Sequence, residues 1–126
     1  MDKRIVIAGS RDYNNYSEAK QYIDMCISQI KNEYTLIFLS GGCRGADMLG
    51  ERYAEENGYP IEKYPAQWHK YGKAAGPQRN RKMAQICDYV ICFWDGKSKG
   101  TKSMIEFAKR MGKTVRVKRI DFQKLP

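Results

Sequence analysis

Residues 35–47 read Thr-Leu-Ile-Phe-Leu-Ser-Gly-Gly-Cys-Arg-Gly-Ala-Asp. The first five form a continuous apolar run with branched and aromatic side chains, which predicts a buried strand. The glycines that follow predict a tight turn. The next segment, 46–57, has the spacing of a helix with Leu49 and Tyr53 facing inward, and Gly58 is suited to its end. A strand, a glycine-bearing turn and a helix in this order indicate a parallel α/β sheet.

The same alternation occurs on either side of this unit. Further strands are expected at residues 4–8, 61–64, 88–94 and 115–117, and further helices at residues 17–31, 78–86 and 101–111. Ser17 is the expected N-cap of the first helix. Residues 65–77 contain two prolines and two glycines without a clear period, which predicts a long surface loop. The predicted fold is a Rossmann-like three-layer sandwich with a mostly parallel, doubly wound sheet of about five strands.

Length and composition limit the possible classes of protein. The 126 residues, of which 42% are hydrophobic, fit one domain over 1–126 with a real core. The longest apolar runs are too short to cross a bilayer, and no targeting segment is visible. The four cysteines include no Cys-x-x-Cys pair and there is one histidine, so neither a metal nor a cofactor is expected. Free thiols favour a reducing compartment, and we expect a cytoplasmic protein without membrane partners.

The charge of the chain is strongly asymmetric. Residues 1–62 carry 7 Lys+Arg against 10 Asp+Glu, whereas residues 63–126 carry 16 against 4. The basic half indicates an anionic partner, which could be a phosphate ligand, a nucleic acid or a membrane surface. Lys109, Arg110 and the basic residues after them lie far along the chain from any glycine-rich loop. They are expected to solvate the last helix and strand, so nucleic acid is not the favoured partner.

Three strand-to-helix loops and one helix start are expected to meet at the carboxyl edge of the sheet. Glycines allow close approach of the backbone to an anion, and a helix N-terminus attracts negative charge. Serine and threonine hydroxyls add donors, and three arginines could each hold a phosphate through two donors. The expected ligand-binding residues are Gly9, Ser10, Arg11, Gly41, Gly42, Cys43, Arg44, Gly45, Asp47, Arg79, Asn80, Asp95, Gly96, Ser98, Gly100 and Thr101.

Some of these residues have more than one possible role. Asp47 either caps the first turn of its helix or, like Asp95, accepts from a ribose hydroxyl or a base amine. Trp68 and Tyr71 either anchor the long loop by packing or stack on a base. Cys43 lacks the neighbouring base that a nucleophile needs.

The motifs together resemble a known family. Gly9-Ser10-Arg11, residues 40–47, residues 68–72, residues 75–80 and residues 93–101 are similar to the small YspA/YpsA-related branch of the SLOG superfamily. The superfamily takes its name from the DNA-processing Smf/DprA proteins and the LOG enzymes. The resemblance covers about residues 4–118 and implies a Rossmann-like fold that binds nucleotides or nucleotide-derived signals. It also hints at a homo-oligomer.

The resemblance to LOG enzymes implies a possible catalytic function with two candidate carboxylates. LOG enzymes carry a Pro-Gly-Gly-x-Gly-Thr motif with a glutamate three residues past the threonine. Here Gly100-Thr101 matches the end of that motif, Met104 stands three residues on, and the nearest carboxylate is Glu106. Positions three and five along a helix differ by about 200° in direction. If the protein is an enzyme, Glu106 or Asp95 is the expected acid or base.

Three functions follow from these observations. The first is a module that senses or sequesters a phosphate-bearing, nucleotide-derived small molecule. The alternatives are a nucleoside 5′-monophosphate phosphoribohydrolase, which splits the N-glycosidic bond, and a nucleic-acid-binding protein. The loops supply convergent donors without a clear catalytic base, which favours the binding module.

Overall fold

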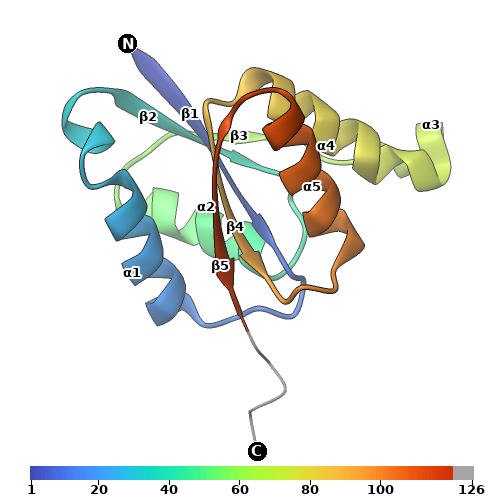
Figure 1. Cartoon of the computed structure of the whole chain (residues 1–126), viewed down its shortest axis with the longest axis horizontal. Helices are drawn as coiled ribbons and strands as arrows, with labels where there is room; N and C mark the ends of the chain where they lie inside the picture. The colour runs from blue at the N-terminus through green and yellow to red at the C-terminus, as the bar shows by residue number, and fades with distance from the viewer. Residues whose placement is uncertain (121–126) are drawn as a thin grey trace, which may run out of the picture.

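Strand β1 (Asp2–Gly9) lies at the centre of a five-stranded sheet whose order is β3-β2-β1-β4-β5 (Figure 1). The other strands are β2 (Thr35–Ser40), β3 (Ile61–Lys63), β4 (Tyr89–Trp94) and β5 (Thr114–Arg119). All neighbouring strands are parallel, with Val6 opposite Leu39 on one side and Val90 on the other. The chain runs outward from β1 in both directions, so the strand order reverses between β1 and β4, where such sheets place ligands. The predicted doubly wound α/β fold is confirmed.

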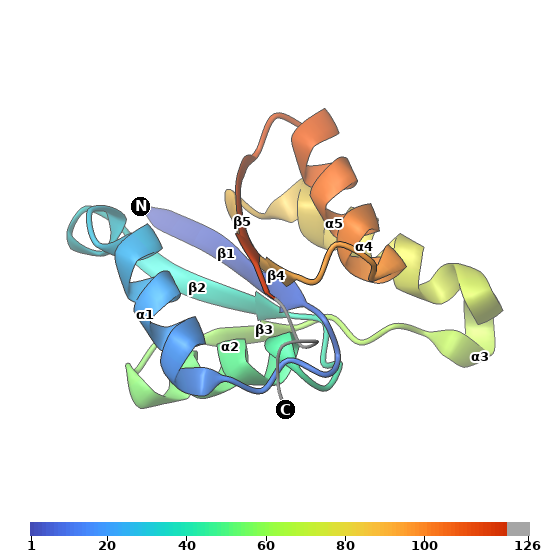
Figure 2. The same ribbon diagram turned by 60° about the horizontal axis from the view of Figure 1, so that its bottom comes forward.

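Four long helices cover the two faces of the sheet (Figure 2). They are α1 (Tyr16–Ile27) and α2 (Ala46–Glu56) on one face, and α4 (Ala75–Ile86) and α5 (Lys99–Arg110) on the other. Side chains alternate along β1, so Ile5 and Ile7 join the core beneath α1 and α2, while Val6 packs with Met83 and Met104 on the opposite face. The two cores explain why the central strands are apolar throughout.

The structure differs from the sequence prediction at the start of α1. The N-cap is Asn15, whose Oδ1 accepts from the backbone N–H of Glu18 at 3.1 Å, and not Ser17. Asparagine caps helices as well as serine does. With Asn15 as the N-cap, the helix begins two residues earlier than with Ser17.

The prediction of a long surface loop at residues 65–77 is wrong. This segment contains the short helix α3 (Trp68–Tyr71), a 3₁₀ turn (Gly72–Ala74) and the start of α4 at Ala75. Pro77 lies in the first turn of α4, where a missing backbone N–H breaks no helical hydrogen bond. Helix α3 projects from the end of α4 away from the sheet (Figures 1 and 2).

The structure describes residues 1–120, and residues 121–126 of the expected 1–126 domain lie outside this range. No helix within residues 1–120 has the length and apolar character needed to cross a bilayer. The cysteines at positions 26, 43, 87 and 92 are free thiols, and Cys87 and Cys92 are buried.

Candidate functional site

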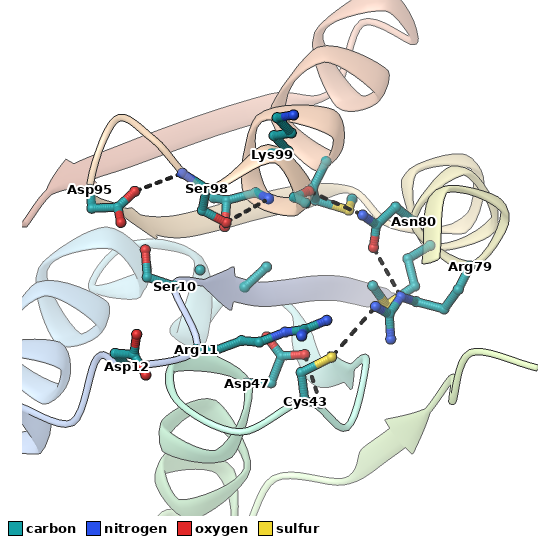
Figure 3. A pocket seen from close by; sticks show the side chains of 16 residues that line it. Ser10, Arg11, Asp12, Cys43, Asp47, Arg79, Asn80, Asp95, Ser98 and Lys99 are labelled. Atoms are coloured by element: carbon teal, nitrogen blue, oxygen red, sulfur yellow. Dashed lines mark hydrogen bonds between the residues drawn. The ribbon is translucent and has the colours of Figure 1, made fainter. Parts of the chain in front are cut away.

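A pocket of about 360 Å³ opens at the carboxyl ends of β1 and β4 (Figure 3). It is formed by the loops after β1, β2 and β4, the first turn of α5 and one side of α4. Residues 41–47 and 95–101 thus border one hollow. Of the residues expected to bind a ligand, the pocket brings together Gly9, Ser10, Arg11, Cys43, Asp47, Arg79, Asn80, Asp95, Ser98, Gly100 and Thr101.

The loop after β1 presents an unpaired hydroxyl to this pocket. Ser10 is 4% exposed, and its Oγ has no hydrogen-bond partner among the described residues. The backbone around it is firmly held, because its N–H donates to the carbonyl of Phe93 at 3.0 Å and its carbonyl accepts from Ala46 at 3.2 Å. A buried polar group without a partner is costly. Ser10 is therefore placed to donate to a bound molecule or water.

The loop after β2 places a carboxyl group inside the pocket. Asp47 is 6% exposed, and its Oδ2 accepts from the backbone N–H of Cys43 at 3.2 Å. Burial raises the pKa of Asp47 to about 6, against the lowering effects of the Cys43 N–H and of Arg79. Asp47 is not the N-cap of α2, because Gly45, with φ of +82°, occupies that position. The carboxyl group can change its charge near neutral pH.

Arg79 on α4 is held by several acceptors around it. Its Nε donates to Asn80 Oδ1 at 2.9 Å, and its Nη1 donates to the carbonyls of Gly41 at 2.5 Å and Tyr64 at 3.4 Å. Its Nη2 donates to the Sγ of Cys43 at 3.7 Å. A guanidinium has five N–H donors, so these contacts leave one for a ligand. Arg79 contributes positive charge to the wall, but a two-donor grip on a phosphate would require it to give up a present partner.

The loop after β4 orients the N-terminus of α5 toward the pocket. Asp95 Oδ1 accepts from the backbone N–H groups of Lys97 and Ser98, both at 2.8 Å. Burial raises the pKa of Asp95, but these two donors outweigh it and the net pKa is lowered. Ser98 caps α5 by accepting from the Thr101 N–H at 3.4 Å, and the two hydroxyls lie 3.1 Å apart. This compact turn presents the first turn of α5 to the pocket.

Five lining residues were missed by the sequence analysis: Ala8, Asp12, Met83, Lys99 and Met104. Lys99 lies within the glycine-rich segment 95–101, so its charge was an available signal. The apolar residues Ala8, Met83 and Met104 had no such signal, because side chains of this type also fill the core. Met83 and Met104 are each 1% exposed and give the pocket an apolar side.

Several expected residues do not line the pocket. These are Gly41, Gly42, Arg44, Gly45, Gly96 and Glu106. Arg44 is exposed and forms an ion pair with Asp12 at 3.3 Å. Glu106 is exposed on α5 and pairs with Arg110 at 3.7 Å, while Met104 lines the pocket three residues after Thr101.

The acidic side chains Asp12 and Asp95 of the pocket have partners among the described residues, in contrast to two of its basic side chains. Asp12 is paired with Arg44, and Asp95 accepts from two backbone donors. Within residues 1–120, the exposed side chains of Arg11 and Lys99 have no hydrogen-bond or ion-pair partner. They lie on opposite sides of the pocket (Figure 3). Together with Ser10 and the first turn of α5, they can hold an anion from two sides.

Comparisons with known proteins agree with the fold and the motifs. The family described as "YspA, cpYpsA-related SLOG family" matches residues 3–71. Gene 61 protein of Mycobacterium phage D29 is 30% identical over 117 residues, which cover 87% of this chain and 91% of that protein.

Two solved structures of DNA processing protein A have the same fold. The protein from Streptococcus pneumoniae superimposes with a TM-score of 0.69 at 21% identity, over 98% of this chain and 52% of its own length. The protein from Helicobacter pylori, described by its single-stranded DNA binding mode, superimposes with a TM-score of 0.64 at 20% identity, over 95% of this chain and 66% of its own. This chain therefore spans about half to two thirds of these proteins.

Proposed function

Because this chain belongs to the YspA, cpYpsA-related SLOG family, we propose that it binds a phosphate-bearing, nucleotide-derived small molecule in the pocket at the strand ends. In this proposal it acts as a sensor or a sequestering module. The family and the fold support a nucleotide-related binding module. The side chains that line the pocket indicate the chemical groups that the ligand carries.

The buried hydroxyl of Ser10, which has no hydrogen-bond partner among residues 1–120, is the observation that carries this proposal. A buried hydroxyl without a partner, in a turn held by backbone hydrogen bonds, supports a ligand that completes its hydrogen bonding. Arg11 and Lys99 supply charge for a phosphate, and the first turn of α5 supplies backbone N–H groups. The apolar side at Met83 and Met104 supports a ligand that also carries a sugar or base.

Mass spectrometry and thermal unfolding test this function. The purified protein is denatured, and any released small molecule is identified by mass spectrometry. In parallel, the melting temperature of the ligand-free protein is measured with a series of nucleotides and nucleotide derivatives. We expect at least one to raise it, since a ligand that binds the native state stabilises it by mass action. No released molecule and no shift across the series would overturn the proposal.

Cleavage of an N-glycosidic bond is a second candidate, favoured by Asp47. An acid or base works best when its pKa lies near the operating pH, and the buried carboxyl of Asp47 has a pKa of about 6 inside the pocket. Neither expected carboxylate is as well suited, because Glu106 lies outside the pocket and Asp95 is held ionised. Chromatography of nucleoside monophosphates incubated with the protein tests this candidate. Substrates left unchanged would remove it, and Asp47→Asn should abolish any cleavage observed.

Nucleic acid is a less favoured partner for the basic half of the chain. Arg110 pairs with Glu106, and Lys113 donates to the carbonyls of Gln85 and Cys87. These contacts give two of the basic residues intramolecular roles. Binding of single-stranded DNA whose affinity falls steeply with salt would support this partner instead.

The cytoplasmic location and the homo-oligomer also belong to our proposal. Free thiols at four positions are compatible with a reducing compartment. Light scattering after gel filtration measures the oligomeric state directly, and a monomer across the accessible concentration range would exclude the oligomer.

A further inference from the structure

A second hollow, of about 390 Å³, lies next to the pocket, and Arg79 lines both. The second hollow is formed by the segment after β3, by α3 and by the first two turns of α4. Its lining includes two tyrosines, two glutamines and two lysines in addition to Arg79, and no acidic residue. The guanidinium of Arg79 bonds to the carbonyls of Gly41 and Tyr64, so it joins the loop of the first pocket to the wall of the second.

The side chains of the second hollow suit a heterocyclic base. Tyr64 and Tyr71 offer aromatic surfaces, and Lys82 lies 5.6 Å from the ring centre of Tyr64. The side-chain amides of Gln67 and Gln78 have no hydrogen-bond partner among residues 1–120. Amides read the hydrogen-bonding edge of a base, and aromatic rings stack on its face.

The short helix α3 is positioned so that Tyr71 borders the hollow. Trp68 is 50% exposed, but its ring packs over Gly76 in the first turn of α4: a β-carbon at position 76 would lie 3.4 Å from Cη2 of Trp68. This contact anchors α3 to α4. Tyr71, one turn later, is 41% exposed and lines the hollow. Of the two roles considered for these aromatic residues, packing fits Trp68 and stacking fits Tyr71.

We infer that the ligand has two nucleotide units, one in each hollow, with the connection between them crossing Arg79. This inference rests on the proposed function, because the first unit is the one whose phosphate lies near Ser10 and Arg11. Each hollow is at the small end of the range for ligand sites, which is about 300–1,000 Å³, so each suits one unit. The remaining N–H of Arg79 is available to the connecting phosphate.

Isothermal titration calorimetry with AMP and with the adenylyl dinucleotide 5′-pApA tests the inference. We expect the dinucleotide to bind about tenfold or more tightly than AMP, because only it places a base against Tyr71. Tyr71→Ala and Lys82→Ala should remove most of this gain and leave the AMP affinity within about twofold. Lys109→Ala, an exposed lysine on α5 outside both hollows, is the matched control and should change neither affinity.

The outcomes separate the inference from the function on which it rests. If AMP binds and Arg11→Gln weakens this binding, but the dinucleotide binds no more tightly than AMP, the inference of a second nucleotide unit is overturned. The proposed function of the first pocket is then still supported. If neither nucleotide binds, the two-unit inference is overturned, whereas the proposed function is decided by the mass spectrometry and the full nucleotide series described above. If both nucleotides bind but Arg11→Gln changes neither affinity, the first pocket is not the binding site and both proposals fail. If a single-stranded oligothymidylate binds more tightly than the dinucleotide and depends on Tyr71, the partner is a nucleic acid and the two-unit small molecule is overturned.

Discussion

A β-carbon on Gly41 would lie 2.8 Å from Cζ of Arg79, so the guanidinium fills the space that a side chain at position 41 would need. The same guanidinium donates to the carbonyl of Gly41. Glycine at this position therefore allows Arg79 to reach across from α4 and form the wall between the two hollows.

We predict that Gly41→Ala displaces Arg79. The substitution should lower the free energy of unfolding by about 1–2 kcal/mol, because a displaced Arg79 gives up hydrogen bonds such as the one to the Gly41 carbonyl. It should also weaken nucleotide binding about tenfold or more, the factor that corresponds to 1.4 kcal/mol. Chemical denaturation and calorimetry measure the two effects.

Gly42→Ala is the matched control for this change. Gly42 has φ of +76° and open space around it, so alanine there should cost about 1–2 kcal/mol of backbone strain without moving Arg79. Equal losses of affinity in the two variants would contradict the role that we assign to Gly41.

We predict that Arg11→Gln weakens the binding of a phosphate-bearing nucleotide by roughly ten- to a hundredfold, because a charge-assisted hydrogen bond contributes about 1.5–3 kcal/mol. Arg44→Gln should change the affinity less than about twofold, since Arg44 is exposed and does not line the pocket, although its ion-pair partner Asp12 does. Both arginines are exposed, so neither change should affect folding. A larger effect at Arg44 than at Arg11 would mean that the ligand lies at the rim of the pocket.

We predict that Ser10→Ala leaves the ligand-free protein at least as stable as the wild type. The substitution removes a buried hydroxyl that has no partner, so no hydrogen bond within the described residues is lost. Ligand affinity should fall about fivefold, or about 1 kcal/mol for one hydrogen bond. Melting temperatures with and without nucleotide give both values, and a marked drop in the ligand-free protein would show that the hydroxyl has a structural role.

We predict that Asp47 makes the protein less stable as pH rises. Burial raises the folded-state pKa of Asp47 to about 6, above the value of 3.8 in the unfolded chain. The stabilising contribution is therefore complete below pH 3.8 and is lost as pH rises through about 6. The two values differ by about two units, which corresponds to at most about 3 kcal/mol.

Asp47→Asn isolates this contribution, because the amide oxygen can still accept from the Cys43 N–H. The stability of the variant relative to the wild type should increase between pH 4 and 7 in chemical denaturation. A constant difference over this range would show that Asp47 titrates normally.

We predict that Asp95 controls the position of the α5 N-terminus. Asp95→Ala leaves the N–H groups of Lys97 and Ser98 without their acceptor. The substitution should lower the free energy of unfolding by about 1 kcal/mol and should weaken ligand binding severalfold. Asp95→Asn keeps an acceptor at Oδ1 and should retain most of the stability and most of the ligand affinity. If the asparagine variant loses as much affinity as the alanine variant, Asp95 contacts the ligand directly through its charge.

The sequence predicted the strands, their glycine-bearing turns and the shared edge, because apolar periodicity and glycine are local signals. It could not predict that Arg44 forms an ion pair with Asp12 while Arg11 has no hydrogen bond or salt bridge within residues 1–120, since the partner of a charged side chain depends on residues distant in sequence. It also missed α3, where Gly72 and the nearby prolines indicate a loop. The contact between Trp68 and Gly76 that anchors this helix exists only in the folded chain.

The central position of β1 has a consequence for how the protein is made. Strand β1 is synthesised before the other strands of the sheet, yet its residues 5–9 pair with residues 89–93, while its residues 2–6 pair with residues 35–39. Pairing across such a large sequence separation slows folding, and the nascent chain cannot complete the ligand site until α5 has been synthesised. A fragment that ends before β4 would expose one edge of its central strand, so truncation should yield an aggregating polypeptide and not a smaller functional unit.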